Sequence, residues 1–267
     1  MRSGDRKPPF ALLAALACTS LAQAQGQSEL EHVAPDPPQT QVHDMSYREM
    51  VDMMGMDDRR RFWQVTLDRL EWQDADDGSR YAWKADAWYG GDYHKIWLQT
   101  EGERVAGTTH DSRLEVGWDH IVSAWWSVRA GVRHDAGFGP SRDWLGGGMA
   151  GLAPGFIEVE ASAYLGEGGR GAFRLSTERD ILFTQRLALQ PEIELNAYSE
   201  DDPERGIGAG LSDAELGLRL RYEIRREIAP YLGILWSWRF GETADLAEAA
   251  GGESSEFSAV AGLRVWF

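Results

Sequence analysis

The last twelve residues of this chain alternate between apolar and mixed side chains and stop on an aromatic carboxyl terminus. One face of this segment is apolar and comprises Phe257, Ala259, Ala261, Leu263, Val265 and Phe267. The other face is mixed and includes Ser258, Gly262 and Arg264. Because successive side chains of a strand point to opposite faces, the pattern predicts a strand with one apolar face. A chain that ends inside such a strand is typical of the closing strand of a bacterial outer-membrane barrel.

Residues 1–24 have the features of a secretory signal peptide. Three basic residues precede a short apolar run at 10–17, and the small residues around Ala24 form a cleavage site. The run is far shorter than the roughly 20 residues of a membrane-spanning helix. Cys18 could instead carry a lipid, but Ala15 stands where a lipidation signal usually has Leu. We therefore expect a mature chain that begins near residue 25 and contains no cysteine.

The composition is acidic and rich in aromatic residues. The chain has 43 acidic and 27 basic side chains, a formal net charge of −16, and 12 tryptophans. This balance argues against nucleic acid as a partner, since nucleic-acid binding needs clustered Lys and Arg. It suits a surface that attracts cations, although acidic loops can also serve solubility alone. After the signal peptide no apolar run could span a bilayer as a helix, which leaves a closed barrel as the way to cross one.

From residue 62 onward about twelve segments alternate as membrane strands do. The clearest covers 215–225, where Leu216, Leu218 and Leu220 oppose arginines on the other face. A soluble sandwich would show the same alternation. Long polar connections at 74–78, 103–110, 135–141, 166–170, 198–211 and 241–255 alternate with short ones at 90–91, 120–123, 153–155, 182–184 and 226–229. Short periplasmic turns and longer outer loops are typical of outer-membrane barrels.

We therefore predict an all-β fold, a transmembrane antiparallel up-and-down β-barrel of about 12 strands, over residues 62–267. Both termini would lie in the periplasm. Residues 25–61 would form a mostly irregular periplasmic tail or plug. Within this tail the sequence Ser46-Tyr-Arg-Glu49 fits a capping box and Gly55 a helix stop, so a short helix is expected near 47–54.

The mixed faces of the predicted strands carry many ionic side chains, among them Lys84, Glu101, Arg174, Glu192 and Arg219. Buried unpaired charges are prohibitively costly, so these groups must pair with one another or meet water. The barrel interior is therefore either an ion-paired filling that only stabilises the fold or a hydrated path that prefers cations.

A cluster of methionines in the tail is the main candidate metal site. The proposed ligands are His43, Met45, Met50, Met53, Met54 and Met56. Thioether sulfur is a soft donor that selects Cu(I), and residues 50, 53 and 54 would share one helix face. The alternative is ordinary packing, because Met readily fills apolar gaps. The segment lies outside the predicted barrel, where little core exists to fill, and the residues alone leave both interpretations open.

The remaining histidines of the barrel region, His94, His110, His120 and His134, are scattered singly and lack the spacing of a zinc-enzyme motif. His134 is the best metal-ligand candidate of these, because the adjacent Asp135 could orient its imidazole. The sequence contains no G-x-S-x-G nucleophile motif. We therefore do not expect an enzyme.

The barrel region closely resembles the copper-resistance protein B (CopB) family of Gram-negative outer membranes. The matching stretches are 67–72 (LDRLEW), 91–98 (GDYHKIWL), 131–135 (GVRHD), 194–198 (ELNAY), 202–208 (DPERGIG), 215–226 (ELGLRLRYEIRR) and the Trp-Phe terminus. The tail also looks like the Met- and His-rich tail of the family, with a single Met cluster in place of many repeats.

The resemblance implies an outer-membrane copper-binding protein that serves copper resistance and homeostasis by sequestering or exporting periplasmic copper. Copper ions, outer-membrane lipid and a periplasmic copper carrier or multicopper oxidase would be its partners. The alternative is a non-specific or cation-preferring porin without a specific metal site.

Overall fold

A computed structural model describes residues 46–55, 60–75, 78–105 and 107–267. The predicted signal peptide and most of the predicted tail lie outside the described residues. The tail helix is present as predicted, as α1 (Tyr47–Met54). Ser46 N donates to Glu49 Oε2 at 2.8 Å, and Glu49 N donates back to Ser46 Oγ at 3.4 Å. This is the reciprocal capping box, and its hydrogen bonds from the Ser46 backbone and side chain lower the pKa of Glu49.

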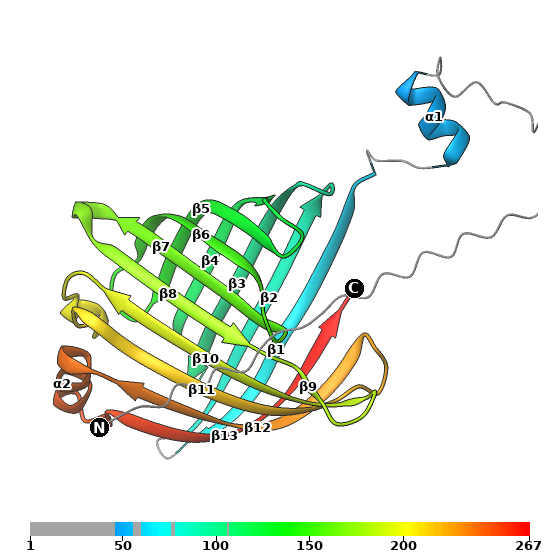
Figure 1. Ribbon diagram of the computed structural model, residues 1–267. Coiled ribbons are helices and arrows are strands. Elements are labelled where there is room, and N and C mark those ends of the chain that lie inside the picture. The colour runs from blue at the N-terminus through cyan, green and yellow to red at the C-terminus, as the bar shows by residue number, and fades with distance from the viewer. Residues whose placement is uncertain (1–45, 56–59, 76–77, 106) are drawn as a thin grey trace, which may run out of the picture. The chain divides into compact units, whose positions relative to one another are not determined.

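Residues 62–266 form a closed antiparallel β-barrel (Figure 1). The strands are β1 (Phe62–Ala75), β2 (Gly78–Gly90), β3 (His94–Val105), β4 (Thr108–Ile121), β5 (Trp126–Gly137), β6 (Arg142–Ala153), β7 (Ile157–Gly166), β8 (Gly171–Glu178), β9 (Ile181–Leu182), β10 (Leu187–Tyr198), β11 (Gly210–Tyr222), β12 (Ile228–Arg239) and β13 (Ser255–Trp266). The barrel closes where β1 pairs with β13. The two-residue β9 follows β8 along β10. Twelve long strands thus surround the lumen, which confirms the predicted architecture.

The two ends of the barrel differ in their connections. One end, called the turn end, carries the start of β1, the end of β13 and the short connections such as 91–93 and 122–125. The opposite end, called the loop end, carries 199–209 with the 3-10 helix η3 (Pro203–Arg205) and 240–254 with α2 (Gly241–Ala249) (Figure 1).

The first two connections at the loop end are much shorter than the sequence predicted. β1 and β2 are separated only by residues 76–77, and β3 and β4 only by 106–107. Gly78 and Gly107 have φ values of 126° and 85°. Glycine adopts a positive φ without a steric penalty, and such a backbone conformation allows tight hairpins. The strands therefore continue into residues that the polar composition had assigned to loops.

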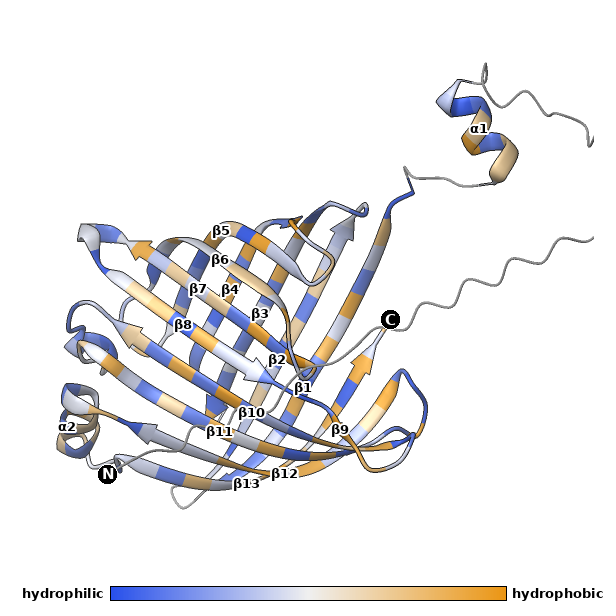
Figure 2. Ribbon diagram, viewed as in Figure 1, coloured by the Kyte–Doolittle hydropathy of each residue, from blue (hydrophilic) through white to orange (hydrophobic). Residues whose placement is uncertain are grey.

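The barrel is apolar outside and ionic inside, the reverse of a soluble protein. Large exposed hydrophobic side chains such as Leu145, Leu165 and Leu232 are 65–68% exposed, whereas Glu71, Arg133 and Arg219 are buried. Figure 2 shows the resulting alternation of hydrophobic and hydrophilic residues along each strand. An outward apolar band around a polar interior is the pattern of a membrane β-barrel. In the part of the chain that the structure describes, no helix has the length and apolar character needed to cross a membrane.

Aromatic rings inside the barrel lie against glycines on the neighbouring strand. Tyr164 is the register partner of Gly146, and a Cβ on that glycine would lie 2.6 Å from the Tyr164 ring. Three other lumen pairs repeat this arrangement: Trp97 with Gly117, Trp144 with Gly166, and Tyr231 with Gly262. The missing side chain makes room for the ring, so part of the high Trp and Gly content is explained by this packing.

Gly146→Val is expected to lower the free energy of unfolding by about 1–3 kcal/mol, because overpacking forces the Tyr164 ring off its glycine. Urea unfolding of the detergent-solubilised barrel, followed by its electrophoretic mobility, would measure the loss. Gly147→Val is the control, since a Cβ there meets only an ordinary contact at 3.6 Å. Equal stability of the two variants would contradict the packing argument.

Candidate functional site

The centre of the lumen is crossed by buried ion pairs. Arg219 on β11 donates to Glu71 on β1 at 2.8 Å and to Glu192 on β10 at 2.7 Å. The side chains of Arg219 and Glu71 are 3% and 0% exposed. Arg69 on β1 also pairs with Glu192. The network therefore joins three strands through charges that are largely buried.

A second group of ion pairs links more distant walls. Arg174 on β8 donates to Glu101 on β3 and to Glu194 on β10, the latter at 2.7 Å. Arg113 on β4 also donates to Glu101, at 2.7 Å. β3 and β8 lie five strands apart around the ring, so this pair spans the lumen. The two groups together are called the central ion-pair layer: Arg69, Glu71, Glu101, Arg113, Arg174, Glu192, Glu194 and Arg219.

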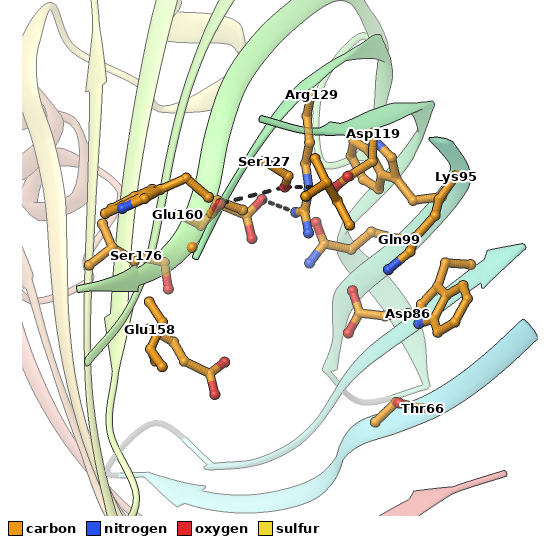
Figure 3. Close-up of a pocket in the computed structure, with 18 of the residues that line it drawn as sticks. Thr66, Asp86, Lys95, Gln99, Asp119, Ser127, Arg129, Glu158, Glu160 and Ser176 are labelled. Atoms are coloured by element: carbon orange, nitrogen blue, oxygen red, sulfur yellow. Dashed lines mark hydrogen bonds and ion pairs between the residues drawn. The ribbon is translucent and has the colours of Figure 1, made fainter. Parts of the chain in front are cut away.

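A cavity of about 660 Å³ opens between this layer and the turn end. Asp119 accepts hydrogen bonds from Ser127 at 3.0 Å and from Arg129 at 2.9 Å, and Arg129 also reaches Glu160 at 3.0 Å. Figure 3 shows how these side chains lie around the cavity. Its ionisable lining consists of the carboxylates Asp68, Asp86, Asp119, Glu158, Glu160 and Glu178 with the cations Lys84, Lys95, Arg129 and Arg264. The excess of carboxylates makes this cavity a region that attracts cations.

Two of these carboxylates face open space. The carboxylates of Asp86 and Glu158 point into the cavity from strands β2 and β7 (Figure 3). Among the described residues, neither has a Lys or Arg nitrogen within ion-pair distance. Carboxyl groups in this position are either hydrated or protonated, because an unpaired charge in a dry interior is prohibitively costly. The turn-end cavity is therefore a polar space whose lining has more acidic than basic side chains.

A smaller cavity of about 360 Å³ lies on the other side of the layer, toward the loop end. The loops around it are tied to the rim. Asp202 of the 199–209 loop accepts from Arg142 at 2.9 Å and from Arg170 at 3.1 Å. Thr243 of α2 contacts Ser212 at 3.0 Å. These contacts hold both long loops against the barrel wall.

The predicted methionine ligands divide between described and undescribed residues. Met50, Met53 and Met54 lie on α1, and the side chains of Met53 and Met54 are 52% and 48% exposed. No residue of α1 is buried. His43, Met45 and Met56 lie outside the described residues. Within the described part of the chain, no group of three or more His, Cys, Asp or Glu side chains is arranged to hold a metal ion.

His134 faces the outside of the barrel and is oriented by a different carboxylate from the one predicted. Its Nδ1 lies 2.6 Å from Oδ1 of Asp143, its register partner on β6. The expectation that Asp135 orients it was wrong. Adjacent residues of a strand point to opposite faces, and Asp135 instead accepts hydrogen bonds inside the lumen from Arg133 and Trp144.

The structure also brings together two histidines that the sequence left apart. His94 on β3 and His120 on β4 are direct register partners, with ring centroids 4.6 Å apart. Only the β3–β4 register could have shown from the sequence that these two histidines are neighbours. That register depends on the two-residue connection at 106–107, which composition had assigned to a longer loop.

Comparison with known proteins identifies the family. The model of the family described as copper resistance protein B precursor (CopB) matches residues 61–267. This chain belongs to the CopB family. Copper resistance protein B of Escherichia coli is 46% identical over 203 residues, which cover 76% of this chain and 69% of that relative. The copper resistance protein B homolog of Pseudomonas syringae pv. tomato is 38% identical and covers 100% of this chain and 97% of its own length.

These relationships support a role of this CopB-family chain in copper resistance. Among solved structures, the NanC porin superposes with a TM-score of 0.50 at 14% identity, over 76% of this chain and 99% of the porin. At that identity the likeness concerns the fold alone. The barrel architecture and its apolar outer band support a location in the outer membrane. Membership of a copper-resistance family also favours a non-enzymatic role.

Proposed function

We propose that this protein binds periplasmic copper through the methionines of α1 and its flanking residues, and that the barrel anchors this segment in the outer membrane. The observation that carries the proposal is the exposure of Met53 and Met54 on a helix that buries none of its residues. The helix by itself offers its methionines no apolar core, which speaks against packing, the alternative explanation of a methionine cluster.

The methionine sulfur donors favour Cu(I), the reduced copper ion. Met50, Met53 and Met54 stand at positions i, i+3 and i+4 of the helix and so share one face. Thioether sulfur is a soft ligand that selects Cu(I) over harder cations. A solvent-exposed site of this kind exchanges its ion readily. That property suits capture of copper and its transfer to or from a periplasmic carrier or a multicopper oxidase.

The barrel supports sequestration or controlled export better than free diffusion. The acidic turn-end cavity would concentrate cations on one side of the central ion-pair layer. The layer itself places Arg174 and Glu101 across the lumen. A non-specific porin needs an open aqueous channel, so this filling speaks against the porin alternative. The periplasmic placement of both termini belongs to the proposal, because the tail can meet periplasmic copper only there.

Replacing Met50, Met53 and Met54 with Leu is expected to reduce copper tolerance toward that of cells lacking the protein. Leu keeps the apolar volume and removes the sulfur. Growth on graded copper and Cu(I) binding by the purified full-length protein would measure the change. The control is Met149→Leu, because Met149 lies on the lipid-facing side of β6 and is 44% exposed. A triple variant with wild-type tolerance and wild-type Cu(I) binding would overturn the proposal.

A further inference from the structure

His94 and His120 occupy the position on two antiparallel strands where side chains approach most closely. Both lie at the turn end, at the start of β3 and near the end of β4. Ile121 N donates to Tyr93 O at 3.0 Å. Hydrogen-bonded and non-hydrogen-bonded pairs alternate along an antiparallel ladder, so the next pair, His94 with His120, is of the non-hydrogen-bonded kind. In such pairs the Cα atoms are only about 4.5 Å apart.

The two imidazoles belong to a stack of three rings. Their centroids are 4.6 Å apart with an interplanar angle of 19°. Trp118 stacks at 5.6 Å from His94 and at 5.3 Å from His120. The indole therefore holds both imidazoles side by side on one face of the sheet.

This face is the outside of the barrel, at the level of the membrane surface. Ile96 and Val116, which follow His94 and His120 toward the barrel middle on the same face, are 61% and 38% exposed. Tyr93 and Trp125, in the adjoining turns, are 66% and 61% exposed. Exposed aromatic side chains beyond an apolar band mark the interface between lipid and water. A hydrated ion could reach the histidines there.

The hydrogen bonding of His120 prepares one nitrogen for a metal. Nδ1 of His120 lies 3.2 Å from the carbonyl oxygen of Tyr93. A carbonyl can only accept, so Nδ1 carries the proton and donates. In the neutral ring this leaves the lone pair on Nε2. A backbone carbonyl that fixes the tautomer in this way is a common support for metal-binding histidines.

We infer that His94 and His120 form a two-imidazole site for a divalent transition-metal ion, best matched to Cu²⁺. Imidazole suits borderline ions, and Cu²⁺ binds such donors most tightly among the first-row divalent metals. His120 keeps its hydrogen bond to Tyr93 O, and the His94 ring must turn its edge toward an ion held on Nε2 of His120. The Cβ–Cγ torsion of histidine is broad, so this rotation is cheap. Water completes the coordination sphere.

The site is separate from the methionine helix in both position along the chain and donor type. It uses nitrogen rather than sulfur ligands and stands on barrel strands alone. The inference therefore does not rest on the proposed Cu(I) binding by α1. A purely structural stack of interfacial aromatic rings is the alternative that the experiment must separate from it.

Full-length protein in detergent micelles is titrated with Cu²⁺ and followed by electron paramagnetic resonance, which reports nitrogen coordination. His94→Gln and His120→Gln are each expected to weaken nitrogen-coordinated Cu²⁺ binding by at least about tenfold, since loss of a supporting partner alone costs 10–100-fold. His110→Gln is the matched control. Its ring stacks on Phe138 at 5.6 Å, and no other histidine ring is stacked with it among the described residues.

Heat-modifiable migration on gels would establish that each variant still forms the barrel. Nitrogen-coordinated Cu²⁺ binding that is unchanged in both His94→Gln and His120→Gln would overturn the inference and leave the rings as a structural stack. The Met50, Met53 and Met54 to Leu variant should keep this Cu²⁺ signal. Failure of the methionine site is therefore distinguishable from failure of the histidine site.

Discussion

Arg219→Met is expected to lower the free energy of unfolding of the barrel by about 3–5 kcal/mol, the usual effect of removing one partner of a buried ion pair. Arg219 neutralises both Glu71 and Glu192. Without it, Glu192 keeps Arg69, but Glu71 keeps the amide of Gln73, at 2.9 Å, and has no other cation within ion-pair distance among the described residues. A fully buried carboxylate would then lack its cation.

Urea unfolding in detergent, followed by tryptophan fluorescence and electrophoretic mobility, would measure this loss. Arg170→Met is the control, because the Arg170 side chain is 33% exposed at the rim and exposed pairs contribute below about 1 kcal/mol. Adding Glu71→Gln to Arg219→Met should recover part of the stability, since it removes the uncompensated charge. If Arg219→Met and Arg170→Met were equally stable, the layer would not be a stabilising element of the barrel.

Replacing Arg174 and Glu101 together with Ser is expected to raise the single-channel conductance of the barrel several-fold. This pair crosses between β8 and β3. We expect its removal to join the two cavities that lie on either side of the layer. The double change keeps the net charge. Arg113 retains Asp135 at 3.6 Å, and Glu194 retains the amide of Asn196 at 3.1 Å.

Planar-bilayer recordings would measure the conductance of wild type and variant. The control is the charge-neutral double change Arg142→Ser with Glu204→Ser, whose 3.3 Å pair lies at the loop end rather than across the lumen. A wild-type protein that already conducts like an open pore would contradict the idea that the central ion-pair layer blocks the lumen. That result would favour the cation-preferring porin over a copper-binding anchor.

Most of the barrel could be predicted from the sequence because its determinants are local. Strand alternation has a period of two residues and is visible in any single segment, such as 215–225. The strand count and the ionic interior followed from the same alternation. The capping box at Ser46 and Glu49 is equally local, and α1 has the predicted bounds. The first two loop-end connections were missed because polar residues in a tight hairpin look like those of a long loop.

The pairings that give the barrel its chemistry were not visible in the sequence. His134 has Asp143 as its partner rather than its neighbour Asp135, and His94 meets His120 across the β3–β4 ladder. Arg219 finds Glu71, 148 residues away, because β11 and β1 curve around the same lumen. The sequence by itself determined which residues face lipid and which face inward, since that depends only on period-two alternation. Only the tertiary structure decided which inward and outward groups meet, because register and barrel closure set those distances.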